Sequence, residues 1–127
     1  MNANHVAQIF EQELSAISDQ RIVAALRKFA VSIRCENRPW DYGIKNQTYP
    51  CWVVADDVDS ATSYVYCEFG FGPQQPWGIL NMLNSPNPNS MGGDWGWFST
   101  LEKALRDSYA WRDLEETGGY DPKTNCS

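Results

Sequence analysis

The chain has 127 residues, which is enough to bury a core and short enough to form one domain. Its composition, 43% hydrophobic and 13% aromatic, excludes a disordered chain, and no apolar run approaches the roughly 20 residues that cross a bilayer. The net charge of −6 is uneven, because residues 51–127 hold eleven acidic and four basic side chains. Since phosphates need Lys and Arg, this balance argues against nucleic acid as a partner.

The first residues, MNANHVAQIFEQEL, contain neither the basic nor the apolar segment of a signal peptide, so we expect a cytoplasmic protein. The four cysteines form no CxxC pair of the kind that zinc sites use. In a reducing compartment, free and mostly buried thiols are the expected state. We therefore predict no metal and no cofactor.

Two helices are expected to open the chain, because apolar residues recur at helical spacing. On the first helix the residues of one face are Val6, Ile9, Phe10, Leu14 and Ile17, with Glu13 the one polar member. On the second helix they are Ile22, Leu26, Phe29 and Ile33. The two stripes are out of phase, and Ser18 or Asp19 can cap the second helix. We predict a break near residue 18, with one bent helix as the alternative.

The middle of the chain is expected to form a small antiparallel sheet. Residues 34–48 are predicted to be a loop, and two strands are predicted at 49–56 and 63–70. Both segments are rich in β-branched and aromatic residues, and the polar turn DDVDSAT lies between them. A third strand is expected at 77–83, with a helix as the alternative, and residues 85–90 are expected to form a surface loop.

A symmetric hairpin would place Val53 opposite Val65 and Cys51 opposite Cys67. A slip by one residue would reverse the two faces. The face expected to pack against helices is small and aliphatic: Cys51, Val53, Ala55, Val65, Cys67 and Phe69. The face expected to be half exposed is aromatic: Trp52, Val54, Tyr64, Tyr66 and Glu68.

The last helix is expected to begin at Ser99, which with Glu102 forms a capping box. The residues expected on its inner face are Leu101, Ala104, Leu105, Ser108 and Trp111. From about residue 118 we expect a mobile tail, since Gly118 and Gly119 end the pattern. The prediction is a single α+β domain over residues 1–127. It has the order ααβββα, with helices on one face of an antiparallel sheet of three or more strands.

Catalytic or metal-binding motifs are weak. His5 is the only histidine and lies near the terminus, where a solvated side chain is expected. Asp56, Asp57 and Asp59 lack the glycine and distal glutamate of an EF-hand, and turn formation explains them without a metal. We therefore expect that the protein is not an enzyme.

The segment with the strongest binding character is Phe69–Phe98, which carries one charge, Asp94, and six aromatic rings. Its densest cluster is Trp95-Gly96-Trp97-Phe98. Such rings occur in interface hot spots and in sugar-binding sites, and they also fasten a helix to a core. An acidic group beside exposed rings would attract Arg or Lys of a partner.

A single acidic, Trp-rich α+β domain without a signal peptide or a catalytic set resembles the small immunity proteins of bacterial contact-dependent inhibition and related polymorphic toxin systems. The resemblance covers the whole chain. It implies stoichiometric binding to a cognate toxin domain, often a nuclease, and it assigns no catalytic residues.

The first hypothesis is therefore a protein-binding inhibitor with a basic protein partner. Its candidate contact residues are Asp56, Asp57, Asp59, Glu68, Asp94, Trp95 and Trp97. The second hypothesis is a carbohydrate or small-ligand module that uses Trp77, Trp95 and Trp97. The third is a small hydrolase with Glu68 and Asp94 as its carboxylate pair, a geometry that a sequence does not determine.

Overall fold

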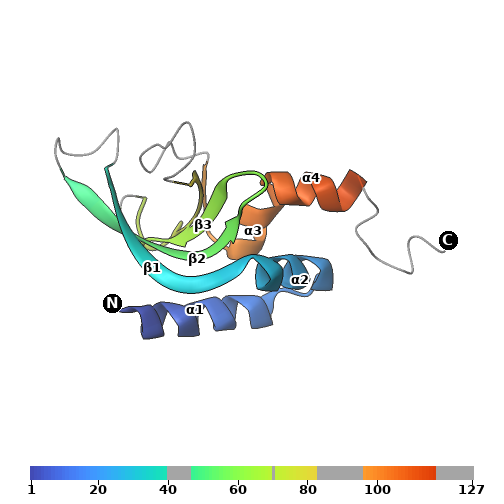
Figure 1. The fold of residues 1–127 in the computed structure, drawn as a ribbon. Helices are drawn as coiled ribbons and strands as arrows, with labels where there is room; N and C mark the ends of the chain where they lie inside the picture. Colours follow the sequence, from blue (N-terminus) through green and yellow to red (C-terminus); the bar gives the residue numbers. More distant parts are fainter. Residues whose placement is uncertain (40–46, 70, 83–95, 117–127) are drawn as a thin grey trace.

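A computed structural model describes residues 1–39, 47–69, 71–82 and 96–116 (Figure 1). Its elements in chain order are α1 (Ala3–Ala16), α2 (Gln20–Phe29), β1 (Ala30–Pro39), β2 (Thr48–Asp57), β3 (Thr62–Tyr66), β4 (Trp77–Asn81), β5 (Trp97–Phe98), α3 (Leu101–Arg106) and α4 (Tyr109–Glu116). The strands form one sheet in the order β1-β2-β3-β4-β5, and every neighbouring pair is antiparallel. The α+β class is confirmed. The predicted loop 85–90 and the tail from about 118 lie outside the described residues.

The break between the first two helices is confirmed. Asn2 caps α1 by accepting a hydrogen bond from the amide of His5, and Asp19 caps α2 by accepting from the amide of Arg21. Glu13, the polar residue on the apolar face of α1, also has a structural role. Its carboxylate accepts a hydrogen bond from the amide of Leu101, at 3.1 Å, and so satisfies a free donor at the first turn of α3.

Strand β1 is where the sequence interpretation is wrong. We expected Ile33 on the second helix and a loop from residue 34, but α2 ends at Phe29 and residues 30–39 pair with β2. Arg27 and Lys28 in the last turn of α2 suit a helix end. Beyond them, Val31 and Ile33 lie on opposite faces of the sheet, because the register of β1 against β2 shifts between Ala30 and Arg34. The helical spacing to Ile33 was coincidental.

The register of the β2–β3 hairpin agrees with the prediction at Val53, which pairs with Val65. The register then shifts, because Ala55 and not Val54 pairs with Tyr64. Val54 is thus an extra residue in β2, a β-bulge. As a result Val54 and Ala55 both join the cluster that packs against the helices. Ala55 was expected to lie with Val53 on the other face.

The two faces of the hairpin have the opposite roles to those predicted. The aromatic set packs against the helices: Trp52, Val54, Tyr64 and Tyr66 share a cluster with Val6, Phe10, Leu14, Ile22, Leu26, Leu101 and Leu105. The small set forms a second cluster in which no helical residue is found within the described ranges. Its buried members are Cys51, Val53, Val65, Cys67, Leu80 and Trp97. Phe69, expected in the small set, is 55% exposed.

The helices approach the sheet from both of its ends, and their core residues join the one cluster that holds Val54, Tyr64 and Trp77. Figure 1 shows α1 along the curved strand β1, whereas α3 packs against β4 and β5. Because the sheet curves, side chains from both ends of the chain nevertheless enter one core. Within the described ranges no helix is long and apolar enough to cross a membrane.

The predicted last helix is two short helices, α3 and α4, separated at Asp107 and Ser108. The hydroxyl of Ser108 donates to the carbonyl of Leu105 and accepts from the hydroxyl of Tyr64, at 2.8 Å. The hydrogen bond from Tyr64 thus ties the junction between α3 and α4 to strand β3. The start near Ser99 and the buried face at Leu101, Ala104 and Leu105 are confirmed. The cap, however, is Thr100, which accepts from the amide of Lys103, and the box of Ser99 and Glu102 is not formed.

Replacing Thr100 with Ala is expected to lower the free energy of unfolding by about 1 kcal/mol, because the amide of Lys103 loses its acceptor. Ser99→Ala is the matched control and should change stability much less, since its hydroxyl accepts only from the exposed amine of Lys103. Urea denaturation of both variants measures the difference. A larger loss of stability for Ser99→Ala would mean that Ser99, and not Thr100, is the cap.

Candidate functional site

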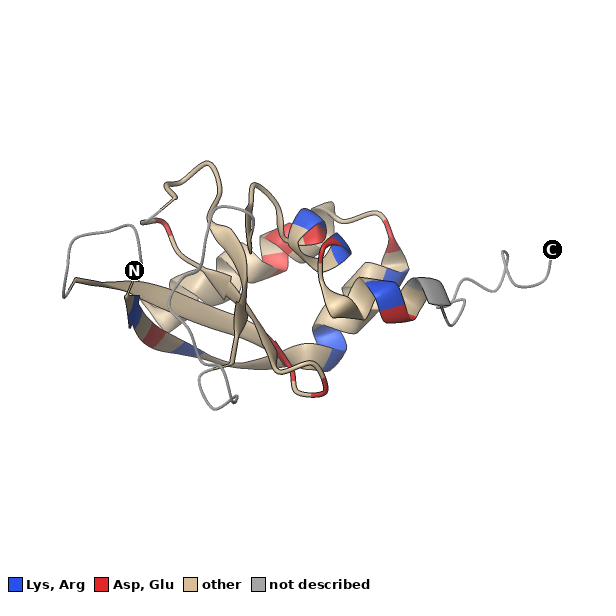
Figure 2. Cartoon of the chain, turned by 90° about the horizontal axis from the view of Figure 1, so that it is seen from above, with Lys and Arg blue, Asp and Glu red and all other residues tan. Residues whose placement is uncertain are grey.

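Most of the predicted contact residues that the structure describes lie on or beside the β2–β3 hairpin. Asp56 and Asp57 end β2, Asp59 is exposed in the turn, and Glu68 is half-buried just after β3. Figure 2 shows acidic residues gathered at this turn, beside basic residues on the neighbouring helices. Asp94 and Trp95 lie outside the described residues.

Trp97 is not available to a partner, which corrects its place among the contact residues. Its side chain is 2% exposed and packs against Gly78 and against the ring of Phe71, with ring centroids 5.8 Å apart. Trp77, proposed for a sugar-binding module, is equally buried in the helix-facing cluster. Both rings belong to the core because β4 and β5 carry them into the two clusters of the sheet.

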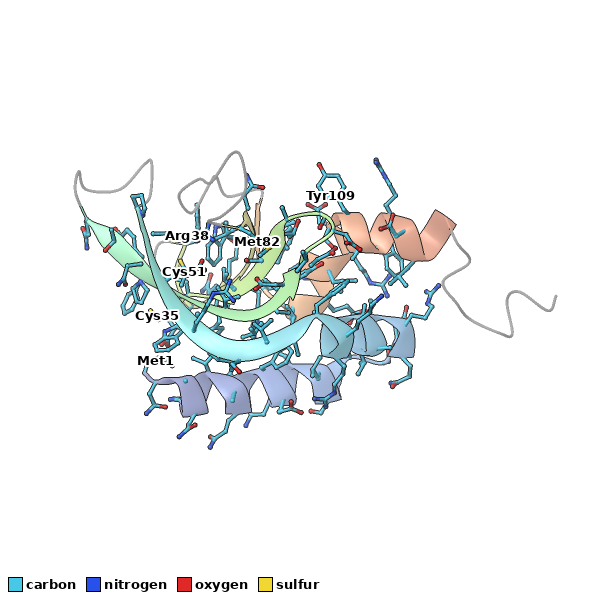
Figure 3. All side chains as sticks on the ribbon, in the orientation of Figure 1. Met1, Cys35, Arg38, Cys51, Met82 and Tyr109 are labelled. Atoms are coloured by element: carbon cyan, nitrogen blue, oxygen red, sulfur yellow. The ribbon has the colours of Figure 1, made fainter. Side chains whose placement is uncertain are left out.

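Asp56 also has a structural role, in a ladder of charged groups on the side of the sheet away from α1. Arg34 donates to Asp56 at 2.8 Å and to Glu36 at 2.9 Å, and Glu36 accepts from the buried Arg38 at 2.7 Å. The hydroxyl of Ser63 completes the ladder on Asp56, at 2.7 Å. Figure 3 shows Arg38 on the same side as Cys51. Asp56 is therefore already satisfied within the fold.

Asp57 and Asp59, in contrast, line a cleft of about 1540 Å³ between α2, α4 and the β2–β3 turn. These three elements come together at one end of the molecule (Figure 1). The remaining residues that line the cleft are Ser18, Asp19, Gln20, Arg21, Ala24, Ala25, Lys28, Phe29, Ser60, Arg106, Tyr109, Ala110, Asp113 and Leu114. Its walls are thus mixed, with small and aromatic apolar groups between charged ones.

One edge of the cleft is held by arginines around Trp111. The guanidinium of Arg21 lies 5.2 Å from the centre of a Trp111 ring, and that of Arg106 lies 4.4 Å from it. Asp19 accepts from Arg21 at 2.9 Å and from Arg106 at 3.4 Å. The hydrogen bond from Arg21 lowers the pKa of Asp19, so this carboxylate stays ionised. These contacts join α2, α3 and α4 into one wall.

The opposite edge is the hairpin turn, which has a fixed geometry. The amide of Ala61 donates to the carbonyl of Val58, and Ala61 adopts a φ of 54°, in the left-handed region that favours glycine. Val58, at the tip, is 73% exposed, and Tyr109, at the first residue of α4, is 63% exposed. The turn and α4, which both flank the cleft, thus each present an apolar side chain to solvent.

Asp57 lies on the cleft side because of the bulge in β2. Ala55 packs among the helices, and Asp57, two residues further along the strand, shares its side. The residue is 6% exposed. Within the described part of the chain, no ion pair or hydrogen bond to its carboxylate is found. Burial of Tyr64 raises the pKa of its own hydroxyl to about 12, and the nearby negative charge of Asp57 adds to that effect.

Sequence reasoning found the hairpin acids but missed the rest of the cleft. Arg21 of α2 and Arg106 of α3 are 85 residues apart in the chain, and they meet at the ring of Trp111 because α2 packs against α4. Tyr109 was hidden by the prediction of one continuous helix, in which it falls outside the inner face. The one available signal was the concentration of acidic residues in the second part of the chain.

Metal chemistry has no visible site here: within the described ranges, no three His, Cys, Asp or Glu side chains are grouped to hold a metal ion. Of the predicted carboxylate pair, Glu68 is described, whereas Asp94 lies outside those ranges. The arrangement that remains is a charged cleft suited to binding. Comparisons of the chain with protein-family models, with curated proteins and with solved structures found no match.

Proposed function

We propose that this protein is a binding inhibitor of the immunity-protein kind, which neutralises a toxin domain by stoichiometric association. The cleft between α2, α4 and the β2–β3 turn carries the proposal. It combines a buried carboxylate, Asp57, with an exposed aromatic ring, Tyr109, and the exposed Val58 lies at the tip of the neighbouring turn. The proposal assigns no catalytic residue to the chain.

The size of the cleft favours a polypeptide segment over a small ligand. Pockets for small molecules usually enclose about 300–1000 Å³, and this cleft has about 1540 Å³. The carbohydrate alternative loses support for a separate reason, because Trp77 and Trp97 are buried and offer no ring to a sugar.

Charge favours a basic partner. Arg21 and Arg106 are already engaged with Asp19, whereas Asp59 is exposed at the turn. Residues 51–127 hold seven more acidic than basic side chains, a balance that would favour the approach of a basic surface. Charges at a rim act mainly on the rate of encounter.

The test is to identify the gene products encoded next to this chain and to co-express each toxin-domain candidate with it, followed by purification and titration calorimetry. A one-to-one complex that restores growth is the expected result. Asp59→Lys should then lower the association rate by about tenfold at low salt. Asp107→Lys makes the same charge change at an exposed position that does not line the cleft, and should have much less effect.

Two outcomes would contradict the proposal. If growth is not restored and no complex forms, the chain is not an inhibitor of that toxin. If the complex forms but both variants associate at the original rate, the partner binds elsewhere.

A further inference from the structure

A buried carboxylate without a partner is costly, so Asp57 needs an explanation. Taking a charged group out of water destabilises a protein unless an opposite charge or hydrogen-bond donors compensate. Asp57 is only 6% exposed, so its carboxylate is largely removed from water. Within the described residues no side chain or amide binds that carboxylate, since Ser60 donates to the backbone carbonyl of Asp57. Its neighbour Asp56, by comparison, accepts from both Arg34 and Ser63.

We propose that Asp57 is the anchor of a binding site for one arginine side chain of a partner protein. The guanidinium would bind the carboxylate, and the aliphatic part of the side chain would lie against the apolar wall. That wall is formed by Ala24, Ala25, Phe29 and Leu114. The proposal rests on the proposed function for its biological ligand, but it names a chemistry that is testable without that ligand.

Arginine fits the cleft better than lysine for two reasons. Its planar guanidinium binds a carboxylate through two hydrogen bonds and loses less hydration than an ammonium group when it is buried. The cleft already accommodates this group, since Arg21 and Arg106 both lie over Trp111. Lys28 also lines the cleft, yet no ion pair between it and Asp57 is formed among the described residues.

The experiment is an NMR titration of the full chain with N-acetyl-L-arginine amide at low ionic strength. We expect saturable shifts at the amides of residues 57–62 and of Ala24 and Ala25. Asp57→Asn should weaken this binding by about tenfold or more, because a charge-assisted bidentate contact is lost. Asp107→Asn, which removes one charge outside the cleft, should change the affinity by less than about twofold.

The unfolding midpoint of Asp57→Asn is the second measurement. An amide of the same shape avoids the cost of an unpaired charge, so the midpoint should stay the same or rise. An unchanged or higher midpoint is expected if the carboxylate serves binding and lowers stability. A lower midpoint is expected if the carboxylate stabilises the fold. A lower midpoint would therefore overturn the proposal.

The remaining outcomes separate this inference from the proposed function. If the arginine probe causes no saturable shift in the cleft, or if N-acetyl-L-lysine amide binds as tightly, the arginine site is wrong. If a toxin complex forms and Asp57→Asn leaves its affinity unchanged, the proposed function is supported and the arginine site at Asp57 is wrong. If the probe binds as expected while no toxin complex forms, the site is supported and the proposed function fails.

Discussion

Replacing Trp97 with Ala is expected to lower the free energy of unfolding by about 4 kcal/mol. The side chain is almost completely buried in the strand cluster, where it contacts Phe71 and the backbone of Gly78. A β-carbon added at Gly78 would lie 2.9 Å from three ring atoms of Trp97, which shows how closely the ring approaches that strand. Its removal leaves a cavity that β4 and β5 cannot fill without moving.

Urea denaturation followed by circular dichroism measures this loss. Since domains of this size are stable by about 5–15 kcal/mol, this loss is a large share of the total, and the urea midpoint should fall clearly. Phe69→Ala is the matched control, because it also deletes an aromatic ring but from an exposed position. Equal and small losses for the two variants would mean that Trp97 is accessible and would return it to the candidate contact residues.

Glu36→Ala is expected to destabilise the protein by about 3 kcal/mol or more. The carboxylate of Glu36 binds Arg38, whose side chain is fully buried, and also Arg34. Without Glu36, Arg38 loses the carboxylate that lies 2.7 Å from its guanidinium. The buried positive charge then lowers the stability by more than the intact ion pair raises it.

Glu11→Ala is the control for this second prediction. It breaks the ion pair with Arg27, whose two side chains are both about half exposed, so water replaces the lost contact and stability should hardly change. Thermal unfolding of both variants at several salt concentrations gives the comparison. A Glu36→Ala variant as stable as Glu11→Ala would show that the ladder is solvated.

Much of the fold was readable from local patterns. The apolar stripe of α1, the cap at Asp19 and the hairpin pairing at Val53 all follow from rules that act over a few residues. The errors lie where long-range contacts decide. The extra residue Val54 moves Ala55 to the face of the sheet that packs against the helices. The sequence of β2 contains no pattern that predicts this bulge.

The candidate site was readable only in part, for the same reason. Charge and turn composition indicated Asp57 and Asp59, which do line the cleft. Composition also indicated Trp97, but an aromatic ring serves equally well in a core and at an interface, and only packing distinguishes the two. The arginines around Trp111 depend on how helices from opposite ends of the chain meet.

The buried cysteines allow the transient opening of the sheet to be measured by thiol labelling. Of the three cysteines that the structure describes, Cys35 is exposed, whereas Cys51 and Cys67 are fully buried and hydrogen-bonded to each other across β2 and β3. That hydrogen bond and burial raise the pKa of Cys51, which keeps its thiol unreactive while the strands are paired. A thiol-modifying reagent would therefore label this pair only when the strands separate. The rate of that labelling reports the opening of the central sheet without any introduced probe.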